Sequence, residues 1–155
     1  MNDNFKALLV TNKNINRGFR DLIVWQEAID LYSYVKKELR TLNDIPLKVK
    51  GQVEDSIFSV SSNIAEGYCR RSIKENIQFL SVALASLGEN YSQIFACTNS
   101  EDLTVNWFNK YDSKHYSLEN KLIKLNKTYI SKLKDKDDWK NDYILREEIG
   151  AYDLD

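Results

Sequence analysis

Apolar residues recur every three or four positions in four separate stretches of the chain, and this is its clearest pattern. Such spacing places the apolar side chains on one face of an α-helix. It predicts helices over residues 21–42, 47–69, 73–98 and 117–133, and no stretch alternates as a strand would. Amphipathic helices joined by short connections predict an all-α fold, an antiparallel up-and-down four-helix bundle.

Each predicted helix has an apolar stripe that we assign to the core. The third stripe is the most regular, because its residues alternate fours and threes like the seam of a bundle. The predicted core residues are Leu22, Trp25, Ile29, Tyr32, Val35, Leu39 and Leu42 in the first helix, Val49, Val53, Ile57, Val60 and Ile64 in the second, Ile73, Ile77, Leu80, Leu84, Leu87, Tyr91 and Ile94 in the third, and Leu118, Leu122, Leu125, Tyr129 and Leu133 in the fourth.

Local signals place several ends of these helices. Asp21 suits an N-cap, Pro46 suits the first turn of the second helix, and Ser72 with Glu75 has the sequence of a capping box. Residues 99–117 have a weaker pattern. Their aromatic residues fit either a short helix or a cap over one end of the bundle.

Composition divides the chain into three parts. Residues 1–18 are rich in Asn and Lys without a period, which predicts a flexible N-terminal arm. Residues 19–134 form the predicted bundle. Residues 135–155 carry eight acidic residues against three basic ones, which predicts an acidic C-terminal tail that is solvated, docks as a short helix or folds on a partner.

The overall composition is typical of a small globular protein. A chain of 155 residues can bury a core without disulfides or metals, and a net charge of −1 lacks the basic footprint of a general nucleic-acid binder. Cys69 and Cys97 stand far apart, which predicts reduced thiols rather than a disulfide or zinc site. The apolar run at residues 7–10 is too short for a signal peptide or membrane span. We therefore expect a cytoplasmic protein that does not enter a membrane.

The single histidine, His115, restricts the chemistry that the chain can perform. A carboxylate-bridged metal pair in a bundle needs Glu-x-x-His from each of two helices. Nothing in the sequence places a serine and an acid beside His115 for a catalytic triad, and no phosphate-binding glycine motif occurs. We expect His115 to be a surface histidine, and we expect no catalytic residue, no metal, no cofactor and no enzymatic activity.

A continuous polar stripe lies beside the apolar stripe of the second helix and leaves three interpretations open. It consists of Gln52, Ser56, Ser59, Asn63, Glu66 and Arg70, and the third helix has a matching row of Glu75, Phe79, Val82, Ser86, Glu89 and Gln93. The stripe could be a solvated face with an i,i+4 pair of Glu66 and Arg70, a buried polar network between helices or subunits, or a binding or catalytic cluster around Glu66 and Glu89. The residues that we assign to an interface or polar network are Trp25, Gln52, Ser59, Asn63, Glu66, Arg70 and Glu89.

Two blocks of sequence resemble a known protein family. Residues 19–28 are similar to an opening F-x-D-L-x-V-W-Q-x-A, and residues 59–67 are similar to the block S-x-x-x-N-I-A-E-G. The likeness extends to Gln52, Arg71-Ser72, Glu75, Phe79-Leu80, Ala83 and residues 86–89, and more loosely to about residue 133. The chain resembles the bacterial four-helix bundle proteins encoded in intervening sequences of large-subunit ribosomal RNA genes.

The resemblance implies a ring-shaped homo-oligomer, a homopentamer, with no established enzymatic activity. Distant relatives are accessory proteins of the reverse transcriptases in diversity-generating retroelements, where a basic surface contacts nucleic acid, and this analogy implies RNA or ribonucleoprotein binding. The candidate nucleic-acid contacts are Arg70, Arg71, Lys121, Lys124 and Lys127. The chain departs from the family pattern Q-I-R-R-A, because Glu54 and Asp55 replace two arginines.

Two functional hypotheses follow from the sequence. The first is a non-catalytic, self-associating accessory or scaffold factor that binds RNA or a reverse transcriptase-like protein. The second is a purely structural or protein-interaction module with no nucleic-acid contact.

Overall fold

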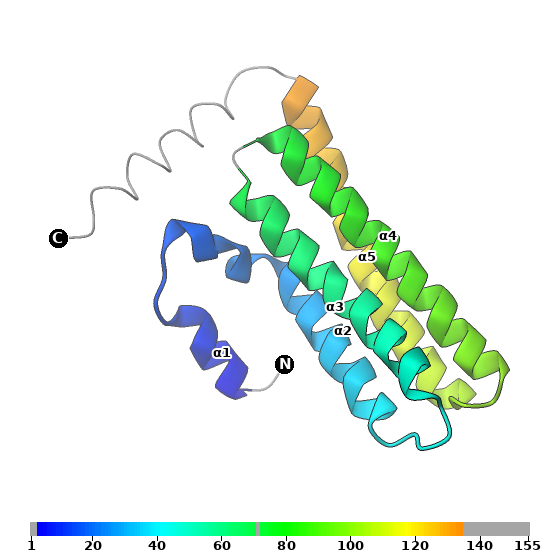
Figure 1. Ribbon diagram of the computed structural model, residues 1–155. Helices are drawn as coiled ribbons and strands as arrows, with labels where there is room; N and C mark the ends of the chain where they lie inside the picture. The colour runs from blue at the N-terminus through cyan, green and yellow to red at the C-terminus, as the bar shows by residue number, and fades with distance from the viewer. Residues whose placement is uncertain (1–2, 71, 135–155) are drawn as a thin grey trace.

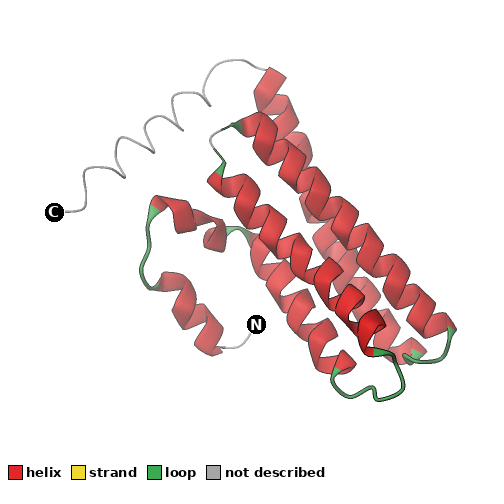
Figure 2. Ribbon diagram, viewed as in Figure 1, coloured by secondary structure: helices red, strands yellow, loops and turns green. Residues whose placement is uncertain are grey.

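In the computed structural model, which describes residues 3–70 and 72–134, the chain is all-helical (Figure 1). The elements are α1 (Asp3–Val10), the 3-10 helix η1 (Ile15–Asp21), α2 (Ile23–Leu39), α3 (Leu47–Cys69), α4 (Ile73–Asn99) and α5 (Val105–Lys134). Within this described part of the chain there is no strand (Figure 2). No helix that the structure describes is long and apolar enough to cross a membrane.

The four long helices α2 to α5 lie side by side, and consecutive ones run in opposite directions (Figure 1). Each contacts two others, since α3 and α5 both pack against α2 and both pack against α4. The contact between α3 and α4 is the most extensive. The four helices therefore enclose one shared core, with α3 and α5 at diagonally opposite corners.

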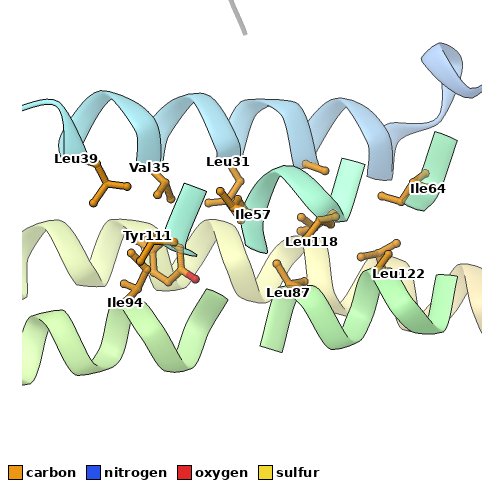
Figure 3. Close-up of a cluster of buried hydrophobic side chains, with 14 of the residues drawn as sticks. Leu31, Val35, Leu39, Ile57, Ile64, Leu87, Ile94, Tyr111, Leu118 and Leu122 are labelled. Atoms are coloured by element: carbon orange, nitrogen blue, oxygen red, sulfur yellow. The ribbon is translucent and has the colours of Figure 1, made fainter. Parts of the chain in front are cut away.

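All four long helices contribute apolar side chains to this core (Figure 3). Burying a leucine or isoleucine side chain stabilises a fold by about 1.5–3 kcal/mol. The fully buried side chains include Leu31, Val35 and Leu39 of α2, Ile57 and Ile64 of α3, Leu87 and Ile94 of α4, and Tyr111, Leu118 and Leu122 of α5.

The core faces of α2 and α4 are turned slightly from the predicted stripes. In α2 the buried residues near its start are Val24 and Ala28, whereas Trp25 and Ile29 are only partly buried. In α4 the core face includes Asn76, Ala83 and Asn90. The apolar pattern did not assign these positions to the core, because alanine is a weak hydrophobic signal and asparagine is a polar residue.

Two of the predicted caps do not form as expected. Asp21 lies in η1 and pairs with Lys13 at 3.6 Å, and the residue before α2 is Leu22, which makes no side-chain capping bond. Ser72 does occupy the N-cap position of α4, but its hydroxyl makes no capping hydrogen bond. Only its backbone carbonyl closes the turn, by accepting from the Asn76 N–H at 3.0 Å.

Helix α5 begins at Val105 rather than near residue 117. The aromatic residues that left residues 99–117 ambiguous lie within this helix, and Trp107, Tyr111 and His115 continue its buried face at spacings of four. Trp107 stacks on Tyr34 of α2 at a centroid distance of 5.1 Å. Contacts with another helix thus extend α5 by three turns beyond its obvious apolar stripe.

The predicted N-terminal arm, residues 1–18, contains regular structure. It includes α1 and the first part of η1. The ring of Phe5 stacks on Trp25 with centroids 6.1 Å apart, and Phe19 meets the same ring edge-on at 5.1 Å. The Arg20 guanidinium donates to the carbonyl oxygens of Leu8, Thr11 and Asn12. The sequence pattern did not reveal α1 because that helix has only eight residues.

The predicted acidic tail, residues 135–155, lies outside the described residues.

Candidate functional site

The polar stripe of α3 and the matching row of α4 face each other in the structure. We call these twelve residues the α3–α4 polar seam: Gln52, Ser56, Ser59, Asn63, Glu66 and Arg70 on α3, with Glu75, Phe79, Val82, Ser86, Glu89 and Gln93 on α4. The Ser86 hydroxyl donates to Ser59 Oγ at 3.2 Å, and the Ser56 hydroxyl lies 2.7 Å from Gln93 Oε1. The seam is thus an interhelical contact whose outer edge reaches the surface.

The inner edge of the seam continues into a buried network that joins three helices. The Asn90 side chain of α4 is fully buried, and its Nδ2 donates to the Val53 carbonyl and to Ser56 Oγ of α3, both at 3.0 Å. The Tyr111 hydroxyl of α5 donates to Asn90 Oδ1 at 2.8 Å. Burial raises the pKa of Tyr111 above its ordinary value, so the phenol stays protonated and remains a donor.

The outer edge of the seam is solvent-exposed and holds local pairs. Arg70 forms an ion pair with Glu66, and its guanidinium lies 4.8 Å from the centre of the Phe79 ring. Asn63 Nδ2 donates back to the Ser59 carbonyl at 2.8 Å. Such exposed i,i+4 contacts contribute only a few tenths of a kcal/mol each.

The two carboxylates of the proposed binding cluster lie apart. Glu89 accepts a hydrogen bond from Gln93 at 3.1 Å and is level with Ser56, which contacts Asn90 and Gln93. Glu66 lies ten residues further along α3, which is about 15 Å at 1.5 Å per residue. Gln52, at the opposite end of the seam, is exposed. Glu66 and Glu89 therefore cannot act together on one small ligand.

Gly67 brings α3 and α4 together at the end of the seam. A Cβ at this position would stand 2.8 Å from Phe79 Cβ and 3.3 Å from both the carbonyl oxygen and Oδ1 of Asn76. Real Cβ atoms do not approach a carbon that closely. The glycine of the N-I-A-E-G block is thus required by the packing of the two helices.

Trp25 lies away from the seam, at the contact with the N-terminal segment. Its neighbours are Phe5 and Phe19. Gln26, the next residue, donates from Nε2 to the Arg20 carbonyl at 2.7 Å. The W-Q pair of the opening block therefore fixes η1 against α2.

The candidate nucleic-acid contacts fall into two groups. Arg70 is paired with Glu66, and Lys121 is paired with Glu27 of α2. Lys124 and Lys127 are exposed on α5 and have no ion pair within the described residues. Arg71 lies outside the described residues. Two of the five candidates are therefore exposed and have no ion-pair partner in the part of the chain that the structure describes.

Two lysines on the side of α5 that faces α2, Lys114 and Lys121, form ion pairs with acids of that helix. Lys114 pairs with Asp30 at 3.2 Å. Burial raises the pKa of Asp30, but hydrogen bonds and nearby positive charges, the Lys114 hydrogen bond first among them, outweigh burial and hold that pKa below its ordinary value. These lysines bind acids of the same molecule.

His115 is buried, and the expectation of a surface histidine was wrong. Its side chain packs between the rings of Tyr91 and Tyr111, with centroids at 4.9 and 5.6 Å, and its Nε2 lies 3.0 Å from the Leu87 carbonyl oxygen. Hydrogen bonding to a backbone carbonyl offsets the cost of burying the imidazole. The only sequence signal was its position, four residues after Tyr111 and three before Leu118.

Cys69 is exposed and Cys97 is buried, and both are free thiols. Burial raises the pKa of each thiol above its ordinary value. A raised pKa lowers the thiolate fraction and so disfavours nucleophilic chemistry. The residues that the structure describes contain no group of three side chains suited to hold a metal.

The geometry defines a helical protein whose distinctive residues serve helix packing and surface contacts. A family model described as the 23S rRNA-intervening sequence protein matches residues 20–124, and the chain belongs to this family. The match confirms the resemblance that the opening block and the N-I-A-E-G block indicated. No curated protein matches the chain.

Proposed function

We propose that this chain is a non-catalytic, self-associating accessory or scaffold factor for RNA or for a nucleic-acid-processing protein. In this proposal its unit is an antiparallel up-and-down four-helix bundle that assembles as a ring, with five copies as the expected number. The observation that carries the proposal is the outer edge of the α3–α4 polar seam. The small side chains of Ser59 and Ser86 meet there, and Val82, one turn before Ser86 on α4, is an apolar residue that is 42% exposed. Such a surface allows another protein to approach closely.

The state of the reactive side chains supports a non-catalytic role. The His115 imidazole is buried against a carbonyl, Glu66 is neutralised by Arg70, and Glu89 is level with a different turn of α3. Catalysis by acid and base groups needs them within hydrogen-bond reach of one reacting atom. The described acids and the histidine do not converge in this way.

The mass of the intact particle tests self-association. Sedimentation velocity and native mass spectrometry of the full chain over a range of protein concentrations should give one discrete oligomer, with five copies expected. A particle that remains a monomer at every concentration would contradict the proposal.

Direct RNA contact is a second candidate, favoured by the exposed and unpaired Lys124 and Lys127. The slope of log affinity against log salt concentration reports the number of phosphates bound, and it should decrease by about one for each phosphate contact that a variant loses. Lys124→Ala with Lys127→Ala should therefore lower the slope by about two. The matched control is Lys37→Ala with Lys110→Ala, which removes two exposed lysines elsewhere. If the wild-type chain shows no RNA affinity even at low salt, the protein-interaction module without nucleic-acid contact is the better description.

A further inference from the structure

Charge is segregated between two parts of the molecule. Residues 51–69 of α3 and 75–99 of α4 contain five acids and no lysine or arginine, namely Glu54, Asp55, Glu66, Glu75 and Glu89. Residues 120–134 of α5 contain five lysines and no acid. Although the net charge of the chain is only −1, the middle parts of α3 and α4 are therefore acidic, between Lys48 and Lys50 at one end of α3 and Arg70 and Lys74 at the other end of the hairpin, and the last turns of α5 are basic.

Part of this charge is neutralised within the molecule. Glu54 pairs with Lys36 at 3.2 Å, Glu66 pairs with Arg70, and Lys121 pairs with Glu27. Of the ten charges counted above, six make no ion pair within the described residues: Asp55, Glu75 and Glu89 on the hairpin of α3 and α4, and Lys124, Lys127 and Lys134 on α5. Lys48 and Lys74, in the first turns of α3 and α4, also make no ion pair within the described residues.

These two charged regions cannot neutralise each other in one molecule. α3 and α5 occupy opposite corners of the four-helix arrangement, since each packs against α2 and α4 (Figure 1). A helix with its side chains is about 10 Å across, so the outward lysines of α5 cannot reach around α4 to Asp55. An ion pair between these lysines and Asp55 or Glu89 therefore requires a second molecule.

We propose that the acidic face of one copy, centred on Asp55, Val82 and Glu89, binds the lysine face of the next copy, centred on Lys124 and Lys127. This inference rests on the proposed self-association and identifies its two surfaces. A contact between two different faces is heterologous, and repetition of such a contact closes into a ring when the rotation permits. The small side chains Ser59 and Ser86 leave room for the incoming helix, and Val82 supplies apolar area at the centre.

Charge reversal and charge swapping test this interface. Lys124→Glu with Lys127→Glu places acid against acid, and Asp55→Lys with Glu89→Lys places base against base. Like charges across an interface cost several kcal/mol, so each double variant should weaken association on the order of 100-fold at low salt. The variant with all four substitutions restores opposite charges and should regain association to within about tenfold of the wild type. The matched control, Lys37→Glu with Lys110→Glu, should associate like the wild type.

The other possible results separate a failure of this interface from a failure of self-association. Circular dichroism first establishes that every variant keeps its helix content. Double variants that keep the wild-type mass, or a four-fold variant that does not recover, would overturn this interface while self-association stands. A wild-type monomer would overturn both proposals. If Lys124→Glu with Lys127→Glu leaves the particle intact but abolishes RNA binding, the lysine face serves RNA and the inference is wrong.

Discussion

At the scale of single residues, Asn90 has the most consequential contacts in the molecule. One amide side chain satisfies a backbone carbonyl and a hydroxyl of α3 and accepts from a tyrosine of α5. A buried polar group costs free energy whenever its partner is missing. The asparagine therefore favours the one alignment of α3, α4 and α5 in which all three partners are present.

Truncating Asn90 should be costly. Asn90→Ala leaves the Tyr111 hydroxyl without its acceptor in the core, and we expect the free energy of unfolding to fall by about 2 kcal/mol in urea titrations. Asn120→Ala is the control, because Asn120 is exposed and, among the described residues, donates to the Tyr116 carbonyl alone. It should change stability by less than about 0.5 kcal/mol. Adding Tyr111→Phe to Asn90→Ala should cost less than the sum of the single changes. Additive effects would show that the two side chains are not coupled.

Two helix glycines should respond in opposite ways to alanine. Gly67→Ala forces a methyl group against Phe79, and such overpacking costs about 1–3 kcal/mol. A Cβ at Gly51 meets nothing within 4 Å, so Gly51→Ala should gain about 0.5–1 kcal/mol from helix propensity. Thermal unfolding of the two single variants, each compared with the wild type, measures these changes in stability. Equal effects would mean that α3 and α4 do not approach closely at Gly67.

At the scale of elements, α5 shows how tertiary contact extends a helix. Its first three turns lack an ordinary aliphatic stripe, yet Trp107 and Tyr111 stack with a centroid distance of 5.6 Å and pack against α2 and α4. Aromatic residues have modest helix propensity. Their burial against neighbouring helices supplies the stabilisation that the local sequence lacks.

Proline substitution tests whether residues 105–116 are helical. Ser113 is exposed, so Ser113→Pro disrupts no core contact but should cost about 3 kcal/mol or more as a helix-interior proline. Asn106→Pro lies in the first turn, where proline is tolerated, and should cost less than about 1 kcal/mol. Unfolding monitored by circular dichroism at 222 nm compares the two. Similar small effects would indicate that α5 begins after Ser113.

At the scale of the whole molecule, the N-terminal segment is an addition to the four packed helices. α1 is attached through Phe5 on Trp25 and through Arg20, and it contributes no side chain to the central core. The core cluster is drawn from α2 to α5 and the loops that join them. The stability of the molecule should therefore depend little on α1.

Removing residues 1–13 should leave the fold intact. The deletion keeps Asn14, which caps η1 by accepting from the Arg17 N–H at 3.0 Å. We expect a loss of about 1 kcal/mol, seen as a fall of a few degrees in Tm, and a rise in acrylamide quenching of Trp25 fluorescence in a background where the other tryptophans are phenylalanine. Phe5→Ala in the same background is the matched comparison and should produce part of the quenching. A collapse of helix content on deletion would place α1 in the folding core.

The sequence by itself determined the helices whose signals are local. The bounds of α3, Leu47–Cys69, match the prediction, because Pro46 marks the start and an apolar stripe runs through the helix. The same local patterns carry the family membership, since the opening block and the N-I-A-E-G block lie within α2, α3 and their entry segment. A helical period depends on residues three and four apart, and such neighbours are visible in one dimension.

The tertiary structure decided what depends on residues far apart in the chain. The sequence could not show that His115 would be buried, because its partner is the Leu87 carbonyl, 28 residues away, nor that Asn90 would join Val53 to Tyr111. It showed the acidic and lysine-rich stretches, but only the packing order places α3 and α5 at opposite corners. Whether a polar residue is satisfied and which charges remain uncompensated are properties of three-dimensional neighbours, and the helical period of the sequence does not contain them.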